Sequence, residues 1–304
     1  MSMQNKKVAV VMSTYNGEKY IREQLDSILN QTYKNIEIVV RDDGSKDGTV
    51  GIVKEYQKSH DNIVLYEGEN VGFVNSFFGL LAIANADYYA YADQDDVWLE
   101  NKIELAVTEL EKLDNSKPNM AFGNSDYYDD EMNFIGYGEK NKKFSFLRSL
   151  YSCIGQGMTF TINQRTKELI TNNRPKSCFF HDWWTYIVCV SMGNVAYNNV
   201  TTVKYRRRKE NATSEGQGYF RLIVWRIKNL LFGNGMKDIK QQMLNFKEIF
   251  YEKLSAENRQ IMDLFGNEKY SFIKAIKKAF YPQRIRSKLI DEIMLRFLFI
   301  FGVL

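Results

Sequence analysis

The sequence predicts an α/β protein whose mostly parallel sheet carries helices on both faces and is followed by a C-terminal helical region. From residue 8 to about 123, short apolar runs alternate with stretches of helical periodicity, and this alternation is typical of βαβ units. Beyond residue 219 only helical periodicity remains. We therefore expect two regions, residues 1–210 with the catalytic chemistry and residues 211–304 with helices alone.

The first strand is predicted at Val8–Ser13, where a continuous apolar run indicates burial on both faces. A helix is expected over 18–31, because apolar residues recur there at helical spacing. The cycle then repeats, with strands expected at 36–40, 62–66, 87–92 and 119–123 and helices at 48–59, 71–85 and 97–113.

The pattern loosens after Gly123, and residues 124–143 have the polar, glycine-containing character of a hairpin. A strand is expected at 154–162, a helix at 181–192 and a last strand at 201–206, with 209–218 as the linker. The C-terminal region should then contain helices near 219–232, 236–254, 256–264, 268–280 and 284–301.

The composition excludes several classes of protein. With 44% hydrophobic and 26% charged residues, the chain is neither collagen, nor a disordered tail, nor a multispan membrane protein. Its 3 Cys form no CxxC pair, which favours a reducing compartment. Because the chain has only 2 His, a metal would be held mainly by oxygen, which favours Mg²⁺ or Mn²⁺. No signal-peptide pattern is present at the N-terminus, so we expect a cytoplasmic protein.

Charge is distributed unevenly along the chain. Residues 1–203 carry 20 Lys and Arg against 27 Asp and Glu, whereas residues 204–304 carry 21 against 10. An acidic region that binds an anion needs a cation between them, and a basic region suits an anionic membrane surface. The alternative is that the basic helices simply have solvated faces.

Polar clusters follow several predicted strands, at the edge where ligands bind in doubly wound sheets. They are Ser13–Asn16, Asp42–Asp43, Asp93–Asp96 and His181–Asp182. No glycine-rich phosphate loop follows the first strand, which argues against hydride-transfer and P-loop enzymes.

The cluster Asp93-Gln94-Asp95-Asp96 places three carboxylates within four residues. A hard cation would relieve their repulsion, whereas a solvated loop that caps the next helix is the alternative. Asp42-Asp43 is weaker evidence, because the following Gly44-Ser45 makes it an ordinary turn sequence.

Three segments, in this order and spacing, resemble family 2 glycosyltransferases of the GT-A fold: VVMSTYNGEKYI, IEIVVRDDGSKDGT and ADYYAYADQDDVW. The resemblance covers residues 7 to about 115 and extends more loosely to about 214. ADQDDVW and HDWW are similar to segments of bacterial rhamnosyltransferases that build cell-wall or capsular polysaccharides. The resemblance implies inverting transfer, with dTDP-rhamnose as donor and a lipid-linked glycan as acceptor. A UDP-hexose or UDP-N-acetylhexosamine transferase and a non-catalytic nucleotide-binding scaffold are the alternatives.

The resemblance also implies where the nucleotide binds. Ser13, Thr14 and Tyr15 would line the nucleotide pocket, with Tyr15 beside the base. Asp43 would accept a hydrogen bond from the N3–H of uracil or thymine.

Further roles implied by the resemblance concern the reacting groups. Asp93 and Gln94 would lie at the ribose and diphosphate, and Asp95 would bind Mg²⁺ or Mn²⁺. Asp182 would be the base that takes the acceptor's proton, although an aspartate at a helix start is also an ordinary N-cap.

One position departs from the family pattern. Tyr205–Asn211 resembles a family segment whose histidine often completes the metal shell, and Arg208 stands in the place of that histidine. A guanidinium cannot bind a cation. Either water and diphosphate complete the shell, or Arg208 binds the diphosphate, or the segment is a solvated basic run.

The C-terminal region has the pattern of a membrane-surface protein. Residues 219–232 place apolar side chains on one face with basic residues at its edges, and residues 293–304 are apolar but too short to span a bilayer. We expect peripheral contact with the anionic inner face of the cell membrane. Packing onto the catalytic domain and self-association into a homo-oligomer are the alternatives, and no nucleic-acid-binding motif is present.

Overall fold

The computed structural model describes residues 6–140, 142–208, 235–266 and 269–303, which form two compact units. The first unit contains Met1–Lys143, Cys153–Arg174 and Phe180–Arg208. The second contains Phe144–Ser152, Pro175–Phe179 and Lys209–Leu304, so it takes in two short segments that precede residue 210. The expected linker at 209–218 and the expected helix at 219–232 lie outside the described residues.

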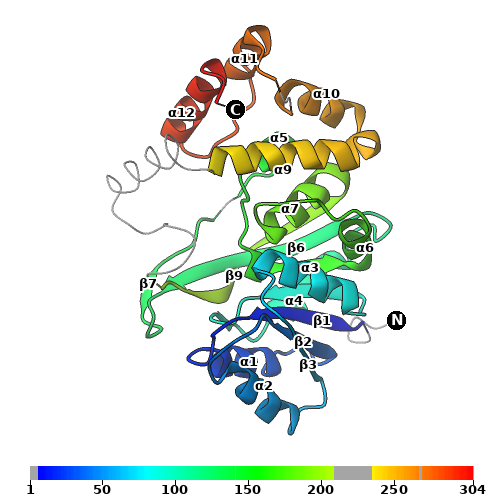
Figure 1. The fold of residues 1–304 in the computed structure, drawn as a ribbon, viewed down its shortest axis with the longest axis vertical. Helices are drawn as coiled ribbons and strands as arrows, with labels where there is room; N and C mark the ends of the chain where they lie inside the picture. The colour runs from blue at the N-terminus through cyan, green and yellow to red at the C-terminus, as the bar shows by residue number, and fades with distance from the viewer. Residues whose placement is uncertain (1–5, 141, 209–234, 267–268, 304) are drawn as a thin grey trace. The chain divides into compact units, whose positions relative to one another are not determined.

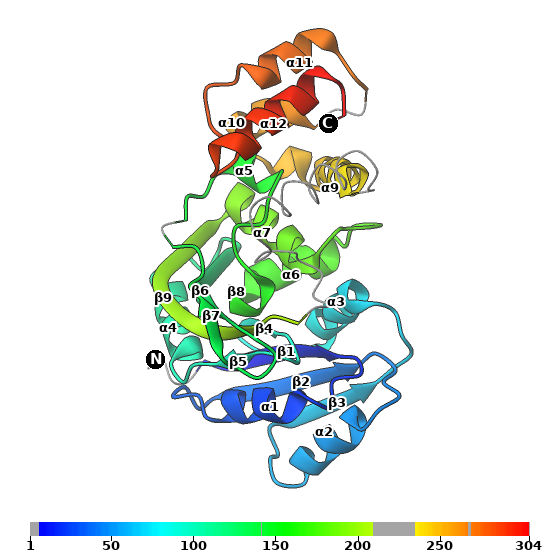
Figure 2. The same ribbon diagram turned by 90° about the vertical axis from the view of Figure 1, so that its left-hand side faces the viewer.

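The first unit is built on a mixed sheet. Its parallel half has the order β3-β2-β1-β4 and is extended by β8-β6-β9-β5, with β7 pairing β6 (Figure 2). The pairings of β8 with β4 and β6 and of β5 with β9 are antiparallel. The strands are β1 Val8–Thr14, β2 Ile36–Asp42, β3 Ile63–Glu67, β4 Tyr88–Ala92, β5 Val97–Trp98, β6 Asn119–Tyr128, β7 Phe134–Gly136, β8 Phe160–Asn163 and β9 Asn194–Arg206.

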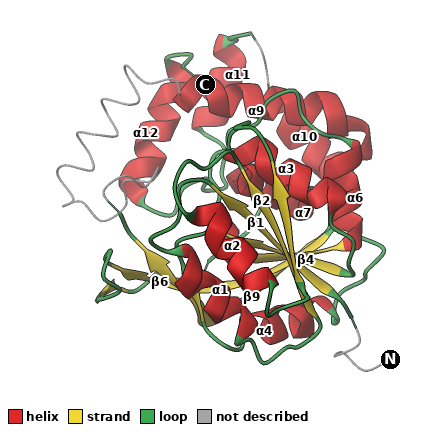
Figure 3. Ribbon diagram, turned by 60° about the horizontal axis from the view of Figure 1, so that its bottom comes forward, coloured by secondary structure: helices red, strands yellow, loops and turns green. Residues whose placement is uncertain are grey.

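Helices cover both faces of this sheet because its central strands are apolar on both sides. Val8, Val10 and Met12 of β1 belong to the core that also contains buried side chains of α1, α2 and α4. Figure 3 shows these helices along one side of the sheet and α3, α6 and α7 along the other. Their bounds are α1 Ile21–Leu29, α2 Thr49–Gln57, α3 Phe73–Ile83, α4 Lys102–Leu110, α6 Gln164–Asn172 and α7 His181–Met192.

Three local predictions are corrected by the structure. Val97–Trp98, expected as the start of a helix, is the short strand β5 paired with β9, and the helix begins at Lys102. The expected strand at 154–162 is instead a loop, a 3₁₀ turn at Gly157–Thr159 and the strand β8. The polar helix α6 and the short helix α5, Phe146–Ser149, were not predicted.

The second unit is helical, with α5 and the helices drawn in yellow to red in Figure 1. They are α9 Gly235–Phe250, α10 Ala256–Phe265, α11 Phe272–Ala279 and α12 Leu289–Ile300. Its core includes three mutually packed rings, since Tyr151, Phe265 and Phe299 have centroids 5.5–6.1 Å apart. Within the described ranges, no helix combines the length and the apolar content that crossing a membrane requires.

Candidate active site

The predicted site residues gather at one edge of the sheet because β1, β2 and β4 are parallel and in register there. Thr14 lies opposite Asp42, and Met12 lies opposite Ala92, the residue before Asp93. The end of β1 is tied to its neighbours, since the Thr14 hydroxyl donates to Asp42 at 2.9 Å and the Ser13 hydroxyl donates to Ser76 at 2.7 Å.

Gln94 is joined to the backbone of Tyr15 by two hydrogen bonds. The Tyr15 amide donates to Gln94 Oε1 at 2.9 Å, and Gln94 Nε2 donates to the Tyr15 carbonyl at 3.0 Å. The amide group of Gln94 is therefore a brace between two strand ends, while the Tyr15 side chain remains 48% exposed. An exposed ring at a strand end is available to stack on a base.

The two aspartates at the end of β2 have different roles. Asp42 is buried and accepts hydrogen bonds from the amides of Gly44 and Ser45 at 3.1 and 2.8 Å, so it shapes the turn. Asp43 accepts from the amides of Val71 and Gly72, both at 2.9 Å, and from the Arg41 guanidinium.

The carboxylate of Asp43 is thus almost enclosed by protein donors. Its side chain is 3% exposed, and three donors already occupy part of its acceptor capacity. A base N–H would have to use the remaining lone pair of Oδ2. Arg41 was not singled out by sequence reasoning, although its position directly before the two aspartates places it next to them.

The acidic loop Asp93–Asp96, which follows β4, contains three carboxyl groups with raised pKa values. Burial, with the neighbouring charges of Asp95 and Asp182, raises the pKa of Asp93 to about 7. Burial also raises the pKa of Asp95, although Arg208 opposes this shift. The pKa of Asp96, whose side chain is fully buried, is raised well above the usual range by burial and by the charges of Asp95 and Asp93.

Two arginines at the end of β9 balance this loop. Arg206, 4% exposed, donates from Nε to the Asp95 carbonyl at 2.8 Å, and its amide donates to Asp96 Oδ1 at 3.1 Å. The Arg208 guanidinium pairs with Asp95 Oδ2 at 2.8 Å. Both guanidinium groups also lie over the Tyr20 ring, at 5.0 and 5.2 Å from its centroid.

Sequence reasoning missed Arg206 and also Lys102. The Lys102 side chain is 1% exposed, its ammonium has no hydrogen-bond partner among the described residues, and it lies 3.7 Å from the centroid of the Trp98 ring. Burial lowers the pKa of Lys102 to about 7, although the charge of Asp96 opposes the shift. A lysine at the start of an amphipathic helix gives no signal in the sequence that it is buried.

Asp182 lies at the start of α7 in a partly buried position. Its Oδ1 accepts a hydrogen bond from the amide of the next residue, Trp183, at 2.7 Å. The N-cap of α7 is Phe180, and no described side chain caps this helix, so Asp182 is not the N-cap that the sequence allowed. Burial raises the pKa of Asp182 to about 6. The charge of Asp182 contributes to the raised pKa of Asp93, so the start of α7 influences the acidic loop electrostatically.

Gly157 leaves space for Asp182. A Cβ at this glycine would lie 2.9 Å from the Asp182 Cβ and 3.0 Å from its Oδ2. The neighbouring Gly155 lies against the Phe160 ring.

The other residues of the HDWW segment are buried. His181 stacks on Phe77 at 3.9 Å between ring centroids and is 7% exposed, and burial lowers its pKa to about 3. Trp183 and Trp184 are 5% and 0% exposed. The indoles therefore belong to the core, and Asp182 is the side chain of this segment that remains available for chemistry.

Within the described residues, no group of three or more His, Cys, Asp or Glu side chains is arranged to hold a metal ion. Asp93 and Asp95 have the carboxylate groups that a divalent ion prefers. One carboxylate oxygen of Asp95 is already paired with Arg208. A divalent ion at this loop would therefore need further oxygen ligands, such as those of a diphosphate.

Comparison with known sequences gives a family. Residues 9–180 match the description of Glycosyl transferase family 2. The chain is 30% identical over 222 residues to the dTDP-rhamnosyl transferase RfbG of Shigella flexneri, a match that covers 66% of this chain and 72% of the relative. It is 38% identical over 122 residues to the glycosyltransferase GlyA of Streptococcus pneumoniae serotype 4, covering 40% of this chain and 17% of that protein.

Comparison with solved structures gives the fold. S. aureus TarS 1-349 in complex with UDP superposes with a TM-score of 0.59 at 18% identity, over 91% of this chain and 75% of that one. The complex of the same protein with UDP-GlcNAc gives a TM-score of 0.55 at 17% identity, over 84% and 78% of the two chains.

Proposed function

The chain belongs to glycosyl transferase family 2, and from that premise we propose that it transfers L-rhamnose from dTDP-rhamnose to a lipid-linked glycan. The similarity to a dTDP-rhamnosyl transferase over 66% of the chain supports this donor. The observation that carries the proposal is the common edge at which β1, β2 and β4 end, because it brings Tyr15, Asp43 and the loop that begins at Asp93 together.

In this mechanism Asp182 takes the proton from the acceptor hydroxyl while that oxygen attacks the sugar carbon from the side opposite the diphosphate. A carboxylate with a pKa near 6 is ionised at neutral pH and is a stronger base than an ordinary aspartate. A single displacement from the opposite side inverts the configuration at the sugar carbon. Because Gly157 has no side chain, the Asp182 side chain can lie close to it.

The nucleotide would lie at the ends of β1 and β2. The exposed Tyr15 ring supports stacking on the base, and the remaining acceptor capacity of Asp43 supports recognition of the N3–H. Ser13 and Thr14 hold the strand end to which Tyr15 is attached. In this arrangement Gln94 positions Tyr15, in addition to the expected contact with the diphosphate.

Members of this family typically use a divalent cation, and at the acidic loop a bound diphosphate would have to supply part of its oxygen ligands. Asp93 and Asp95 present hard carboxylate oxygens, and burial is the main cause of their raised pKa values. These two side chains would hold Mg²⁺ or Mn²⁺, which would neutralise the leaving diphosphate. Arg208 would supply a second positive charge at the same place.

A UDP-sugar is the second candidate donor. Uracil and thymine present the same N3–H, so Asp43 would recognise either base. The structural neighbour S. aureus TarS 1-349 has been crystallised in complex with UDP-GlcNAc, which makes UDP-N-acetylhexosamine the alternative to test first. A UDP-hexose is the other UDP-sugar considered as a donor.

The acceptor and the location are proposed from the second unit. Its helices α11 and α12 and their ends expose aromatic and aliphatic side chains, among them Phe272, Ile273, Phe280, Leu289, Phe297 and Phe301. Residues 209–304 of this unit also carry 17 Lys and Arg against 10 Asp and Glu. Apolar exposure combined with positive charge supports peripheral binding to the inner face of the cell membrane, where a lipid-linked acceptor would be found.

A donor-hydrolysis panel tests the proposal. The full chain is incubated with dTDP-rhamnose, UDP-GlcNAc and UDP-glucose, and release of each nucleoside diphosphate is measured. We expect dTDP-rhamnose to be used at least about ten-fold faster than the others, the discrimination that differences in sugar contacts supply. Faster use of a UDP-sugar would replace the rhamnosyl assignment with the second candidate.

A further inference from the structure

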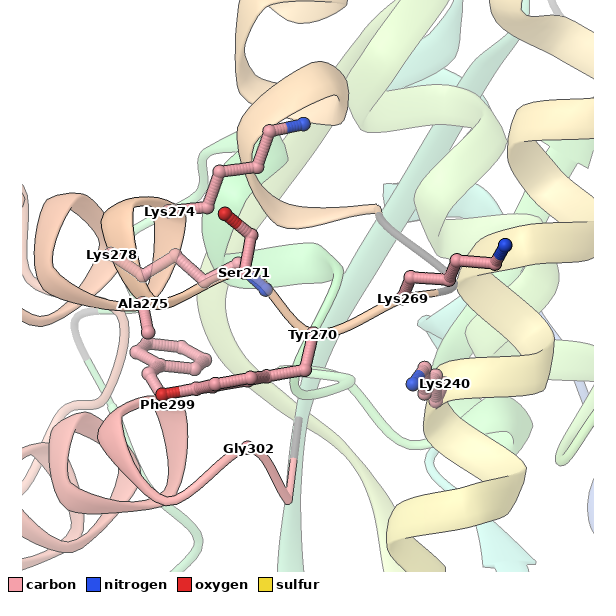
Figure 4. A pocket seen from close by; sticks show the side chains of 9 residues that line it. All are labelled: Lys240, Lys269, Tyr270, Ser271, Lys274, Ala275, Lys278, Phe299 and Gly302. Atoms are coloured by element: carbon pink, nitrogen blue, oxygen red, sulfur yellow. The ribbon is translucent and has the colours of Figure 1, made fainter.

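A pocket in the second unit gathers four lysines. Lys240 of α9, Lys269, and Lys274 and Lys278 of α11 line a depression with about 330 Å³ of space, part of which is open solvent (Figure 4). Among the residues that the structure describes, the remaining lining residues are Tyr270, Ser271, Ala275, Phe299 and Gly302, and none of these carries a carboxylate.

Lys278 is the unusual member of this group. It is 6% exposed, and its ammonium forms no hydrogen bond or ion pair with another described residue. It lies 5.5 Å from the centroid of the Phe299 ring. Burial, together with the positive charges of Lys240 and Lys274, lowers the pKa of Lys278 to about 8. A lysine with so little exposed surface beside like charges is destabilising unless an anion compensates its charge.

The neighbouring acidic residue does not provide that compensation. Lys274 Nζ donates to the backbone carbonyl of Asp263 at 3.0 Å. The carboxylate of Asp263 instead accepts from Lys247 at 3.2 Å and from the Tyr251 hydroxyl at 2.7 Å. The charged side chains in the described part of the pocket lining are therefore all lysines.

We propose that this lysine pocket binds a phosphate or diphosphate group. Several ammonium groups and the Ser271 hydroxyl offer donors to one anion, and charge-assisted hydrogen bonds to phosphate oxygens are the strong kind. Phe272 and Ile273, exposed on the same helix, favour a phosphate presented by a lipid over a free one. The proposal concerns the second unit alone and does not depend on the donor site.

The first test measures binding of inorganic pyrophosphate to the full chain by calorimetry. EDTA is present to remove divalent ions from the donor site. Nucleoside diphosphates are left out, because their diphosphate would compete for the lysine pocket. We expect Lys278→Gln to weaken binding at least about ten-fold, since it removes a charge-assisted contact. Lys277→Gln is the matched control, because Lys277 is exposed, lies on the same helix and is absent from the lining. It should change binding by less than about two-fold.

Should Lys278→Gln fail to fold, Lys240→Gln, a less buried member of the lining, takes its place with the same expected loss. The second arm uses vesicles of phosphatidylcholine with and without phosphatidylglycerol. Binding to the anionic vesicles that pyrophosphate competes away identifies the lipid headgroup as a source, whereas pyrophosphate binding alone identifies a free anion. Equal losses in the Lys277 and Lys278 variants, or no binding of either probe, would overturn the proposal.

Discussion

The Arg208 guanidinium lies 2.8 Å from the Asp95 carboxylate, so a fixed positive charge occupies one oxygen of the acidic loop. The sequence placed Arg208 where related proteins often have a histidine that binds the metal. The structure brings this arginine to the residue expected to hold the metal. This arrangement favours a shared role in which Arg208 and a divalent ion both neutralise the leaving diphosphate.

Removal of divalent ions is therefore expected to slow the enzyme without stopping it. With EDTA, Arg208→Ala should reduce the remaining donor turnover by about 10²-fold, the cost of removing one preorganised donor to developing charge. Arg207→Ala is the matched control, because its guanidinium stacks 3.8 Å from the centroid of the Tyr127 ring. Complete loss of wild-type turnover in EDTA would show that Arg208 does not share the role of the metal.

Asp182→Asn should lower transfer by about 10² to 10⁴, because the amide cannot accept the proton of the acceptor hydroxyl. Affinity for dTDP should stay close to that of the wild type, since the proposed nucleotide contacts come from the ends of β1 and β2. Asp61→Asn, at an exposed position, controls for the loss of one carboxylate. Turnover of the Asp182 variant at the wild-type rate would remove Asp182 from the mechanism.

The raised pKa of Asp182 also predicts how stability depends on pH. The folded state holds the proton to about pH 6, whereas an ordinary aspartate loses it near 3.8. As pH rises through this window, ionisation of Asp182 therefore destabilises the wild type relative to the unfolded chain. Asp182→Asn should have a higher Tm than the wild type above pH 6 and an equal Tm below about pH 4. A Tm difference that does not change with pH would contradict the assignment.

Catalytic turnover should depend on the same ionisation of Asp182. Turnover should rise with pH, whereas stability falls. Below pH 6 the base is protonated, so turnover should fall about ten-fold per pH unit and reach its plateau as pH rises above 6. Initial rates measured between pH 4.5 and 8 at saturating donor would show this limb. The residual activity of Asp182→Asn should lack it.

Gly157→Ala tests how tightly Asp182 is positioned. The added methyl group would lie 2.9 Å from the Asp182 Cβ, so the helix start or the turn must move. We expect turnover to fall about 10²-fold while dTDP affinity changes little, because a displacement near 1 Å is enough for such a loss. Gly51→Ala in α2 is the control, since a Cβ at Gly51 would meet no atom within 4 Å and the alanine favours the helix.

The part of the fold that follows from local pattern was predictable. The apolar runs at β1, β2 and β4 place three polar clusters at one sheet edge, because parallel strands in register end together. Val97–Trp98 was assigned to a helix because apolar periodicity continues through it, yet its pairing with β9 involves residues about a hundred positions later. Short strands fixed by such distant partners carry no local signal.

The supporting residues of the site were hidden for the same reason. Arg206 reads as one member of a basic run, and only the return of β9 to the acidic loop reveals that it is buried against Asp95 and Asp96. Likewise, Asp43 was predicted to bind the uracil or thymine ring. The structure adds that its carboxylate accepts hydrogen bonds from the amides of Val71 and Gly72. Side chains that act through distant contacts cannot be identified from spacing.

The last prediction concerns membrane binding by the second unit. Removing residues 284–304 would be a poor test, because Phe299 of α12 is 0% exposed and packs on Tyr151 and Phe265 in the core. Substitution of exposed side chains avoids this problem. The double variant Phe280→Ser and Phe301→Ser changes rings that are 76% and 75% exposed, so the fold should be retained.

We expect the wild type to bind vesicles that contain phosphatidylglycerol and to be released in part by high salt. Each Lys or Arg near an anionic surface contributes about 1 kcal/mol, and salt screens this attraction over roughly 8–10 Å. The apolar contact resists salt, so the double variant should lose mainly the fraction that remains bound at high salt. Co-sedimentation measures both fractions, and Ile83→Ser, an exposed apolar residue of α3, is the control. Equal binding to anionic and neutral vesicles would contradict the electrostatic part, and an unchanged salt-resistant fraction in the double variant would assign these rings to contacts other than lipid.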